Sequence, residues 1–472
     1  MKKYLTRIFA LLLSLFILFA LSGCKSSSDK GSSSDITGTT DTDDSTGIGV
    51  NVSVSNTQGS AGAAEGTGDS GNSASGATNA GNPKAPSTAK GSTVEICNWN
   101  PITEYPQMSD LKAKFEKKTG ITIKWTVASY ENYCVEIASR VAADNAPDII
   151  RFKFMNVAEM ELAQPLKNSR YNFNTDKWDK QVLDYYTVNG KAYAANTANS
   201  LINSPFLMTY NRDIIAMYDY EDPYTLWKNG KWTWDKLMEM CEDYNKDTGN
   251  AGMIIYTYDS WCRLNGYQGI LSFKDGRYGS NIHDTKFQQL LSQANNYKST
   301  GIQKTWDYDG FNSGKYPFME NMAIHLRRAN PYFAGLKGEA KLGVVPYPTI
   351  EGASTVYTPI GELEAYGFAK GAKNIEAAPY VLEYLLDANN YDESTYFYSA
   401  EALEVYKYVM AQPNRVVHTR YPDGKFNKSD IDNIHGGFDG KALSQITTYA
   451  AKVKDTLNTY ISNLNNRLSK LK

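Results

Sequence analysis

The sequence predicts an α/β fold in which helices pack on the faces of a largely parallel sheet. Three features of residues 94–153 predict this fold: the order of the segments, their periodicities and a helix stop signal. An apolar run at 94–97 precedes a helical pattern at 109–119 and a strictly alternating run at 121–127. A second helical pattern at 131–143 and an apolar run at 148–152 follow. Strands that alternate with helices in this order are typical of a parallel sheet.

The first helix has a clear end. Leu111 and Phe115 lie four residues apart on one face, and Gly120 stands where a helix C-cap requires positive φ. The alternating residues after Gly120 place apolar side chains on one face of a strand. Ligands of such sheets bind at the carboxyl ends of the strands, so we expect binding residues at the strand ends near 97, 127 and 152.

Predicted strands and helices continue to alternate along the remainder of the chain. Residues 206–213 predict a strand that runs into a helix, and residues 253–258 predict another strand. Thr233 is a candidate N-cap for a helix with a buried stripe at Leu237, Met240, Cys241 and Tyr244. A longer apolar stripe near the C-terminus predicts a helix that packs on the second part of the protein, although a membrane-seeking helix or a coiled coil would use the same stripe. Its members are Ile446, Ala450, Val453, Leu457, Leu464 and Leu468.

The N-terminus carries an export signal. A basic start with Lys2, Lys3 and Arg7 precedes an apolar segment that ends in Leu21-Ser22-Gly23-Cys24. This ending resembles the lipobox of bacterial lipoproteins, which implies cleavage after residue 23 and acylation of Cys24, and two acyl chains hold a protein on a membrane. An uncleaved membrane anchor is the alternative. We therefore expect a lipid-anchored protein on the extracellular face of a bacterial cell membrane.

Residues 24–92 contain the lipidated cysteine and a disordered Gly/Ser/Thr-rich linker. After Cys24 this segment has no aromatic residue and no leucine, so it cannot bury enough apolar surface to fold. It includes chance matches to GxGxxG and to Gly-Asp-Ser-Gly at 66–71, which neither follow a strand nor open a helix. We give these matches no functional weight.

Composition excludes some partners. Removal of residues 1–23 takes three of the 49 basic residues and leaves all 51 acidic ones, so the mature net charge is near −5. A net negative chain argues against nucleic acid as the main partner. The chain is rich in aromatic residues, with 34 Tyr, 17 Phe and 8 Trp. Part of this surplus suits a ligand groove, because a tyrosine ring stacks while its hydroxyl hydrogen-bonds, and a general composition bias explains it equally well.

The patterns of an enzyme or a metal site are weak. Cys97, Cys134, Cys241 and Cys262 have no metal-ligand spacing, and they are either buried free thiols or disulfides of unknown pairing. The four histidines show no HExxH pattern, and the mature domain has no GxSxG. The loop at 307–310 resembles part of a calcium loop but lacks the flanking carboxylates. We expect no cofactor, no metal and no catalytic residue.

Short motifs along the chain resemble those of the extracellular solute-binding proteins of ABC importers, the branch that includes the maltose-binding proteins. These motifs are Phe-Glu-Lys-Lys-Thr-Gly-Ile at 115–121, Ala-Pro-Asp-Ile-Ile at 146–150, Tyr-Asn-Arg-Asp at 210–213, Lys-Trp-Thr-Trp-Asp-Lys-Leu at 231–237, the segment 320–327 and the helix start at 374–378. Each motif is short, and their order together with the lipobox carries the resemblance over essentially all of 94–472.

The resemblance implies a two-lobed periplasmic-binding-protein-like (type II) fold, with discontinuous lobes joined by a hinge. The solute-binding domain is then 93–472. Lobe one is expected at about 94–203 and 317–370, and lobe two at about 204–316 and 371–472. The resemblance further implies a monomer that delivers its ligand to the permease subunits of an ABC transporter in the same membrane.

A carbohydrate groove needs aromatic platforms and planar hydrogen-bonding partners. The candidates follow the predicted strands or lie in loops of the second lobe: Trp99, Glu104, Tyr130, Glu131, Arg151, Phe152, Lys153, Trp261, Arg327, Arg328 and Glu362. Trp261 is the expected platform opposite the first lobe. The four basic residues among these candidates also suit an acidic sugar, so the charge of the ligand stays open.

We therefore predict a tethered protein that closes its two lobes around a carbohydrate, with an oligosaccharide as the expected ligand. A binding protein for a peptide, a polyamine or another non-sugar solute is the first alternative. A cell-surface glycan hydrolase is the second, because a pair such as Glu362 and Glu364 could act as its two carboxyls. Neither the sugar, its length nor the permease follows from the sequence.

Overall fold

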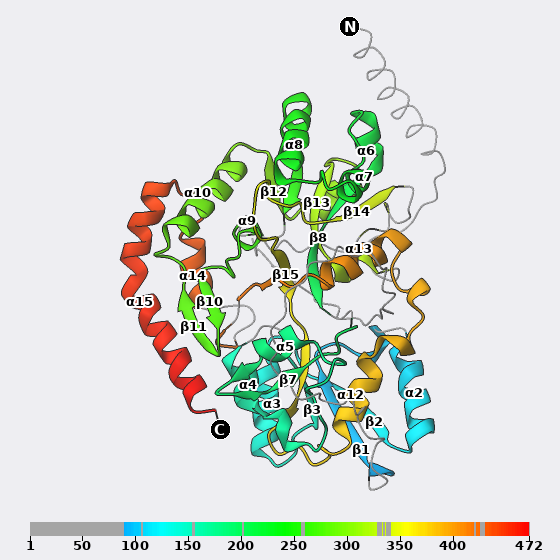
Figure 1. Ribbon diagram of the computed structural model, residues 1–472. Helices are drawn as coiled ribbons and strands as arrows, with labels where there is room; N and C mark the ends of the chain where they lie inside the picture. Colours follow the sequence, from blue (N-terminus) through cyan, green and yellow to red (C-terminus); the bar gives the residue numbers. More distant parts are fainter. Residues whose placement is uncertain are drawn as a thin grey trace, which may run out of the picture. The chain divides into compact units, whose positions relative to one another are not determined.

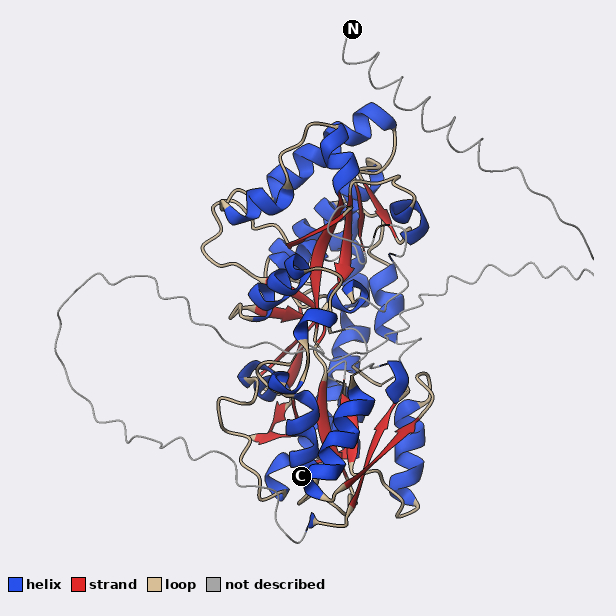
Figure 2. Cartoon of the chain, turned by 90° about the vertical axis from the view of Figure 1, so that its right-hand side faces the viewer, coloured by secondary structure: helices blue, strands red, loops and turns tan. Residues whose placement is uncertain are grey.

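The computed structural model describes residues 89–104, 107–152, 156–200, 203–255, 260–327, 333, 336, 341–419, 422–424 and 430–471. The predicted signal peptide, Cys24 and nearly all of the predicted linker lie outside these residues. Within them the chain builds two main sheets with helices on their faces, as the red strands between blue helices in Figure 2 show. The predicted α/β fold with two lobes is confirmed.

The first sheet contains the strands that the sequence predicted near the start of the domain. Parallel pairing joins β1 to β2 and to β3, and β16 runs antiparallel beside β3. The strand order is β2 (Thr122–Val127), β1 (Thr93–Asn98), β3 (Ile149–Phe152), β16 (Ala365–Ala369) and β4 (Ala163–Gln164), with β7 (Ala194–Ala195) also beside β16. The helices of this part are α2 (Met108–Thr119), α3 (Tyr133–Ala142), α4 (Val157–Leu162), α5 (Lys180–Tyr185) and α12 (Ala378–Leu386), with short 3-10 turns η2 (Ile102–Glu104) and η3 (Leu166–Asn168).

The second sheet is built around β8, the strand that follows the first crossing between the lobes. Its order is β12 (Gln303–Thr305), β9 (Met253–Ile255), β13 (Phe318–Met322), β8 (Ser204–Asn211), β15 (Thr358–Glu362) and β17 (Arg415–Val417), with β14 (Leu342–Pro346) also beside β8. Its helices are α6 (Arg212–Met217), α7 (Pro223–Lys228), α8 (Trp234–Thr248), α9 (Ser260–Leu264), α10 (Thr285–Ser299), α11 (Tyr308–Asn312), α13 (Ala400–Met410), α14 (Asp430–Gly436) and α15 (Leu443–Ser469). Short 3-10 turns also occur at η4 (Ala323–Leu326), η6 (Ala388–Asn390) and η7 (Glu393–Thr395).

Local signals explain where several helices begin and end. The helix α2 ends at Gly120, which has φ of 71° and donates its N–H to the carbonyl of Glu116, as predicted. Thr233 caps α8, because its hydroxyl accepts the N–H of Lys236 at 3.2 Å. Asn211 caps α6 in the same way. The predicted helix boundaries at Gly120 and Thr233 are confirmed.

Two short hairpins use the turn residues that their geometry requires. The hairpin of β5 (Thr187–Val188) and β6 (Lys191–Ala192) turns at Asn189-Gly190, and both residues have positive φ. The hairpin of β10 (Leu271–Lys274) and β11 (Arg277–Ser280) turns at Asp275-Gly276 in the same conformation. Asn-Gly and Asp-Gly favour the two-residue turn that matches the twist of the flanking strands.

The boundary of the lobes differs from the expected one. Residues 317–370 were expected in lobe one, but β13 and β14 pair with β8 in the second sheet, and β15 also pairs with β8. Only β16 of that range belongs to the first sheet, so the chain crosses back between Glu362 and Ala365. Residues 371–472 were expected in lobe two, yet α12 packs on α2, and its Tyr384 ring lies 5.1 Å from the ring of Phe115. Pairing between strands far apart in sequence, which short motifs do not encode, sets these boundaries.

The C-terminal helix buries the predicted stripe. Ile446, Ala450, Val453, Leu457, Leu464 and Leu468 are all buried. The helix α15, red in Figure 1, packs against α10 and β11 and also reaches α4, where Arg467 forms a two-point ion pair with Glu161 at 2.8 and 2.6 Å. The packing interpretation of the stripe is therefore confirmed. Among the residues that the structure describes, no helix is long and apolar enough to cross a membrane.

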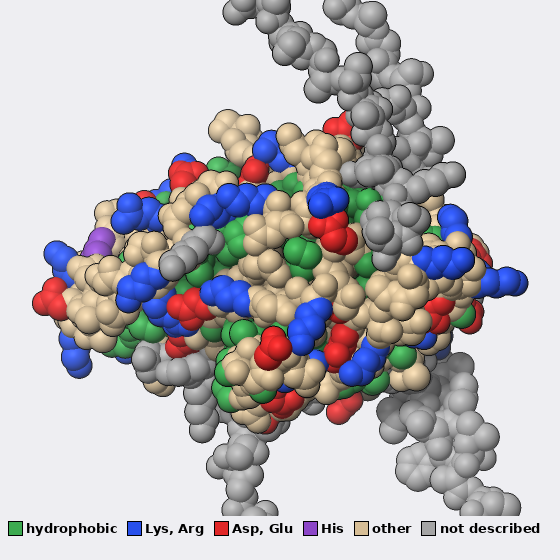
Figure 3. All heavy atoms as spheres, turned by 90° about the horizontal axis from the view of Figure 1, so that it is seen from below, with side chains coloured by type: hydrophobic (Ala, Val, Ile, Leu, Met, Phe, Trp, Pro, Cys, Tyr) green, Lys and Arg blue, Asp and Glu red, His purple; other side chains and the backbone are tan. Residues whose placement is uncertain are grey.

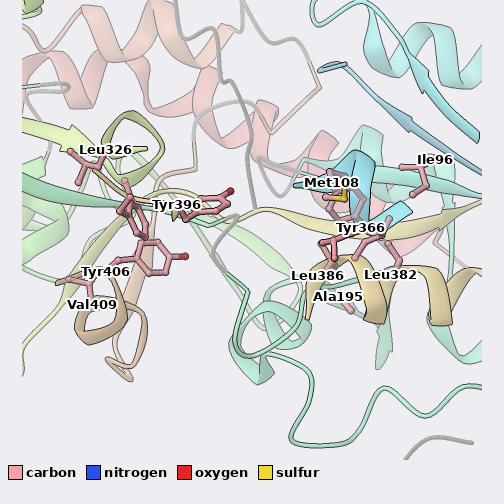
Figure 4. Close-up of a cluster of buried hydrophobic side chains, with 14 of the residues drawn as sticks. Ile96, Met108, Ala195, Leu326, Tyr366, Leu382, Leu386, Tyr396, Tyr406 and Val409 are labelled. Atoms are coloured by element: carbon pink, nitrogen blue, oxygen red, sulfur yellow. The ribbon is translucent and has the colours of Figure 1, made fainter. Parts of the chain in front are cut away.

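The apolar core includes side chains from both sheets. One continuous cluster of buried side chains joins Ile96 and Tyr366 of the first sheet to Leu326 and Tyr406 of the second lobe. Figure 4 shows these two groups of side chains. On the face drawn in Figure 3, basic and acidic side chains are interspersed, in keeping with a chain of 49 basic and 51 acidic residues.

Candidate functional site

The candidate site lies at the edges of the two sheets where the chain crosses between them. In the first sheet, the carboxyl end of β3 at Phe152 lies opposite Ala365, the first residue of β16 after the crossing. In the second sheet, the carboxyl end of β13 at Met322 lies opposite Phe206, near the start of β8. Ligands of open α/β sheets bind at the carboxyl ends of strands. We call these two edges the hinge edges.

Arg151 organises the first hinge edge. Its side chain is fully buried, and its Nη2 donates to Oε1 of Glu364, which is 1% exposed. Its Nη1 donates to Oδ1 of Asn98 at 3.0 Å and to Oδ1 of Asn100 at 2.9 Å. These residues and Trp99 form the first-lobe cluster. The charge of Arg151 is thus matched inside the protein, and its side chain holds the residues that follow β1.

Trp99 is a supported ring with little exposed surface. The guanidinium carbon of Arg151 lies 4.0 Å from the ring centroid, and Tyr133 and Tyr130 meet the ring edge-on at 4.9 and 5.9 Å. The hydroxyl of Tyr133 donates to the carbonyl of Cys97 at 2.9 Å and accepts the N–H of Arg151 at 2.8 Å. Burial raises the pKa of Tyr133 well above its usual value, so it stays a neutral donor. Trp99 is 8% exposed, and the half-buried Tyr130 is the outer ring of the pair.

A second buried arginine and carboxylate lie in the other lobe. Arg263 Nη2 donates to Oγ of Ser260 at 2.7 Å, and that hydroxyl donates to Oε1 of Glu320. The Arg263 and Glu320 side chains are fully buried, with a closest N–O distance of 3.9 Å. The guanidinium also covers the ring of Phe206 at 4.8 Å. This cluster fastens α9 to β13 and β8, which is a structural role.

The second hinge edge also carries an aromatic and imidazole group that the sequence analysis missed. Trp306 follows β12 with φ of 39°, a left-handed conformation that costs a residue other than glycine about 1–3 kcal/mol. Its ring lies 5.2 Å from that of Tyr308. The hydroxyl of Tyr308 lies 3.1 Å from Nδ1 of His325, which lies 2.6 Å from Oδ1 of Asn321. Backbone strain of this kind persists mainly at functional sites, so we add Trp306 and Tyr308 to the candidates.

Two of the predicted second-lobe residues are held by internal contacts. The ring of Trp261 packs on Trp234 at 4.5 Å, and its Nε1 donates to Oε1 of Gln293 at 2.9 Å. Trp261 remains half-buried. Arg327 is 5% exposed, and its guanidinium carbon lies 5.7 Å from the ring centroid of Tyr396. Both residues therefore contribute to packing whether or not they touch a ligand.

The remaining candidates are spread over different environments. Glu131 is exposed, whereas Phe152 is fully buried with its ring 5.3 Å from that of Tyr186, in the core of the first lobe. Glu104 belongs to η2 and Glu362 to β15, but their side chains lie outside the described part of the structure. Lys153, Arg328 and Cys24, the predicted site of lipid attachment, lie outside the described residues altogether.

A separate hollow of about 380 Å³, including the open space at its mouth, lies within the second lobe. Aromatic side chains line it, among them Trp227, Trp232, Tyr347, Tyr357 and Tyr408. Because residues of α7, α13 and the segments after β14 supply this lining, closure of two lobes would not enclose it. We therefore place the candidate site at the hinge edges.

The described residues offer little support for a metal site or for a reactive thiol. In the described part of the chain, no group of His, Cys, Asp and Glu could hold a metal ion. Asp307, from the calcium-like loop, instead caps α11 and bonds to Lys304 and Tyr316. Cys97, Cys134, Cys241 and Cys262 are all free thiols. Burial raises the pKa of Cys97, Cys134 and Cys241, which lowers their reactivity.

The two lobes, their crossings and the paired hinge edges define a type II solute-binding fold. The profile of the bacterial extracellular solute-binding protein family matches residues 110–394, more than half of the chain. The chain belongs to this family. It is 25% identical over 293 residues to the maltodextrin-binding protein MdxE of Bacillus subtilis (strain 168), which covers 60% of this chain and 67% of that protein.

Solved structures of similar proteins agree with the fold. The maltose-binding periplasmic protein MalE of Listeria monocytogenes, in complex with maltose, has a TM-score of 0.55 and 15% identity over 80% of this chain and 98% of its own. An extracellular solute-binding protein of Staphylococcus aureus, also in complex with maltose, has a TM-score of 0.55 and 14% identity over 81% and 98%. At these identities the likeness shows the fold alone.

Proposed function

We propose that the protein captures a carbohydrate, most simply an oligosaccharide, between its two lobes. The observation that carries this proposal is the pairing of aromatic rings with neutral hydrogen-bonding groups at both hinge edges. Tyr130 beside Trp99 on one edge, with Asn100 next in the chain, and Trp306 beside Tyr308 on the other, offer ring faces and polar atoms of the kind that sugars require. The similarity to a maltodextrin-binding protein supports the same ligand class.

The matched charges at the hinge edges favour a neutral sugar. Arg151 bonds to Glu364, and Arg263 bonds through Ser260 to Glu320. A uronic acid would need a cation that is available to its carboxylate, because a buried charge must be paired. Arg151 and Arg263 already have carboxylate partners, so we favour a neutral oligosaccharide as the ligand.

Capture proceeds by closure of the lobes, without covalent chemistry. A ligand that touches both hinge edges binds the closed form more tightly than the open form, and this difference shifts the population toward closure. Glu364 and Glu320 each accept a hydrogen bond from an internal donor. Because a glycan hydrolase needs a carboxyl that gives a proton to its substrate, neither residue is suited to act as the general acid. These contacts support binding and transport as the function.

The N-terminal segment supplies the anchor. We propose that Cys24 is acylated, that residues 25–92 tether the domain to the outer face of the cell membrane, and that the loaded protein delivers its sugar to the permease of an ABC importer. The sequence Leu21-Ser22-Gly23-Cys24 and the composition of the linker support this arrangement. Labelling with a palmitate analogue, lost in Cys24→Ala, tests the anchor.

A thermal-unfolding panel of residues 89–472 tests the ligand class. The panel contains maltodextrins of increasing length, uronic-acid oligosaccharides, amino acids, polyamines and short peptides. A specific ligand at a hundred times its Kd stabilises the fold by about 2.7 kcal/mol. We expect stabilisation by neutral oligosaccharides. Stabilisation by a peptide or an amine alone would keep the fold and refute the sugar, and loss of the sugar during incubation would indicate a hydrolase.

A further inference from the structure

We propose that Glu364 is a positioning residue: through Arg151 it sets the conformation of the binding loop, residues 98–104, and connects that loop to the second crossing between the lobes. The inference rests on the proposed function for the role of the loop in sugar binding. The contacts that carry it do not depend on the identity of the ligand.

Glu364 has a special place in the chain. It lies between β15 of the second sheet and β16 of the first, within the segment that crosses from one lobe to the other. The first lobe holds this segment through its backbone. Tyr186 donates its hydroxyl to the carbonyl of Leu363 at 2.7 Å, and Asn196 donates its amide to the carbonyl of Glu364 at 3.0 Å. The Glu364 side chain therefore projects from an anchored backbone and gives Arg151 a fixed partner.

Arg151 passes this constraint to the loop after β1. Its two terminal nitrogens have different partners. Nη2 donates to Glu364, and Nη1 donates to Asn98 at 3.0 Å and to Asn100 at 2.9 Å. The N–H of Asn100 also donates to Oδ1 of Asn98 at 3.0 Å, which closes the turn. The guanidinium covers one face of Trp99, the residue between the two asparagines. One side chain thus fixes three consecutive residues of the binding loop.

Stability alone does not explain such a pair. Replacement of a buried ion pair by well-packed apolar side chains is often neutral or stabilising, whereas removal of one partner is costly. An apolar pair could fill the same space, but it could not hold two asparagine carbonyls. The Arg263–Glu320 pair of the second lobe has the same burial, and its contacts fasten α9 to β13 without reaching the loop after β1. It is the matched control.

The test compares two double variants, Arg151→Met/Glu364→Leu and Arg263→Met/Glu320→Leu. Hydrogen exchange of the free protein, read on peptides that cover residues 98–104, reports the loop without any ligand. We expect loop exchange at least tenfold faster in the first double variant and unchanged in the second. Calorimetry should show sugar binding at least tenfold weaker in the first and within about threefold of wild type in the second. Unchanged loop exchange in a folded Arg151→Met/Glu364→Leu protein overturns the proposal.

A single variant covers the case in which the first double variant does not fold. Asn100→Ala leaves the buried ion pair intact and removes one link between Arg151 and the loop. We expect faster loop exchange and at least fivefold weaker sugar binding in a protein that still unfolds cooperatively. Wild-type exchange in Asn100→Ala would overturn the proposal. A wild-type protein that binds no sugar would instead refute the proposed function, while loop exchange would still decide the role of Glu364.

Discussion

The most specific stability prediction concerns the ion pair between Asp179 and Arg415, which joins the two lobes. Arg415 lies in β17 of the second sheet, and Asp179 precedes α5 of the first lobe. The pair is nearly buried, with side chains 6% and 7% exposed, and its two N–O contacts measure 2.7 and 2.6 Å. The same carboxylate caps α5, since its Oδ1 accepts the N–H groups of Gln181 at 2.9 Å and Val182 at 3.2 Å.

Two substitutions at Asp179 separate these roles. Asp179→Asn retains a capping oxygen but leaves Arg415 without its carboxylate, so we expect a loss of about 3–5 kcal/mol in the free energy of unfolding. Asp179→Ala removes the cap as well and should cost about 1 kcal/mol more. Urea unfolding at pH 7 measures both changes, provided that the slope with urea stays constant.

The adjacent residue provides the control. Lys180 pairs with Asp184 at 3.0 Å, but both side chains are largely exposed, at 85% and 63%. Lys180→Ala should change the free energy of unfolding by less than about 0.5 kcal/mol, because exposed pairs contribute little. If Asp179→Asn were as mild as Lys180→Ala, the pair would not stabilise the contact between lobes. If Asp179→Ala matched Asp179→Asn, the cap would contribute nothing.

Three further outcomes follow from individual contacts. Burial opposes ionisation of Asp307, but hydrogen bonds from partners such as Lys304 outweigh it and lower the pKa of Asp307 to about 2, so its stabilisation is complete above about pH 4 and is lost as the pH falls toward 2. Unfolding midpoints of wild type and Asp307→Asn should therefore converge over that window, and a constant difference would contradict the pairing. Gly343→Ala should destabilise the protein by about 1–3 kcal/mol or more, because its Cβ would lie 2.0 Å from the buried ring of Tyr210. Gly436→Ala is the control and should not destabilise the protein, because open space surrounds that position. Equal thermal midpoints for the two variants would refute the predicted steric overlap. The described cysteines should react with a thiol reagent at pH 8 only after unfolding, and a gain in mass on reduction would reveal a disulfide that the structure lacks.

Local signals in the sequence were sufficient for several elements. The helix α2 and its stop at Gly120 follow from spacing and from the freedom of glycine to adopt positive φ. The buried stripe of α15 follows from helical periodicity over 27 residues. The parallel pairing of β1, β2 and β3 follows from the alternation of strands and helices.

Long-range pairing was the part that the sequence could not provide. The sequences of short apolar segments such as β13 and β14 do not indicate which sheet these strands join. In the structure, their antiparallel pairing with β8 places them in the second lobe. Long-range contacts also limit what the sequence indicates about the site. Arg151 was a candidate ligand contact, but its side chain bonds to Glu364, which lies 213 residues away in the chain, and this contact is internal to the protein.

Strain at Trp306 was also invisible in the sequence. An aromatic residue in the left-handed region is a property of the folded backbone, and Asp307-Tyr308-Asp309-Gly310 resembled a metal loop instead. The aromatic pair directly after a short strand was the available signal. This aromatic pair indicates a binding site only once β12 is known to end at the second hinge edge.

The most direct test of carbohydrate capture is a calorimetric titration of residues 89–472 with a maltodextrin series, followed by mass analysis of the recovered sugar. We expect saturable binding with one sugar per protein, a negative heat-capacity change from buried aromatic surface, and sugar recovered intact. The absence of binding across neutral oligosaccharides, or recovery of shortened sugar, would contradict capture by lobe closure.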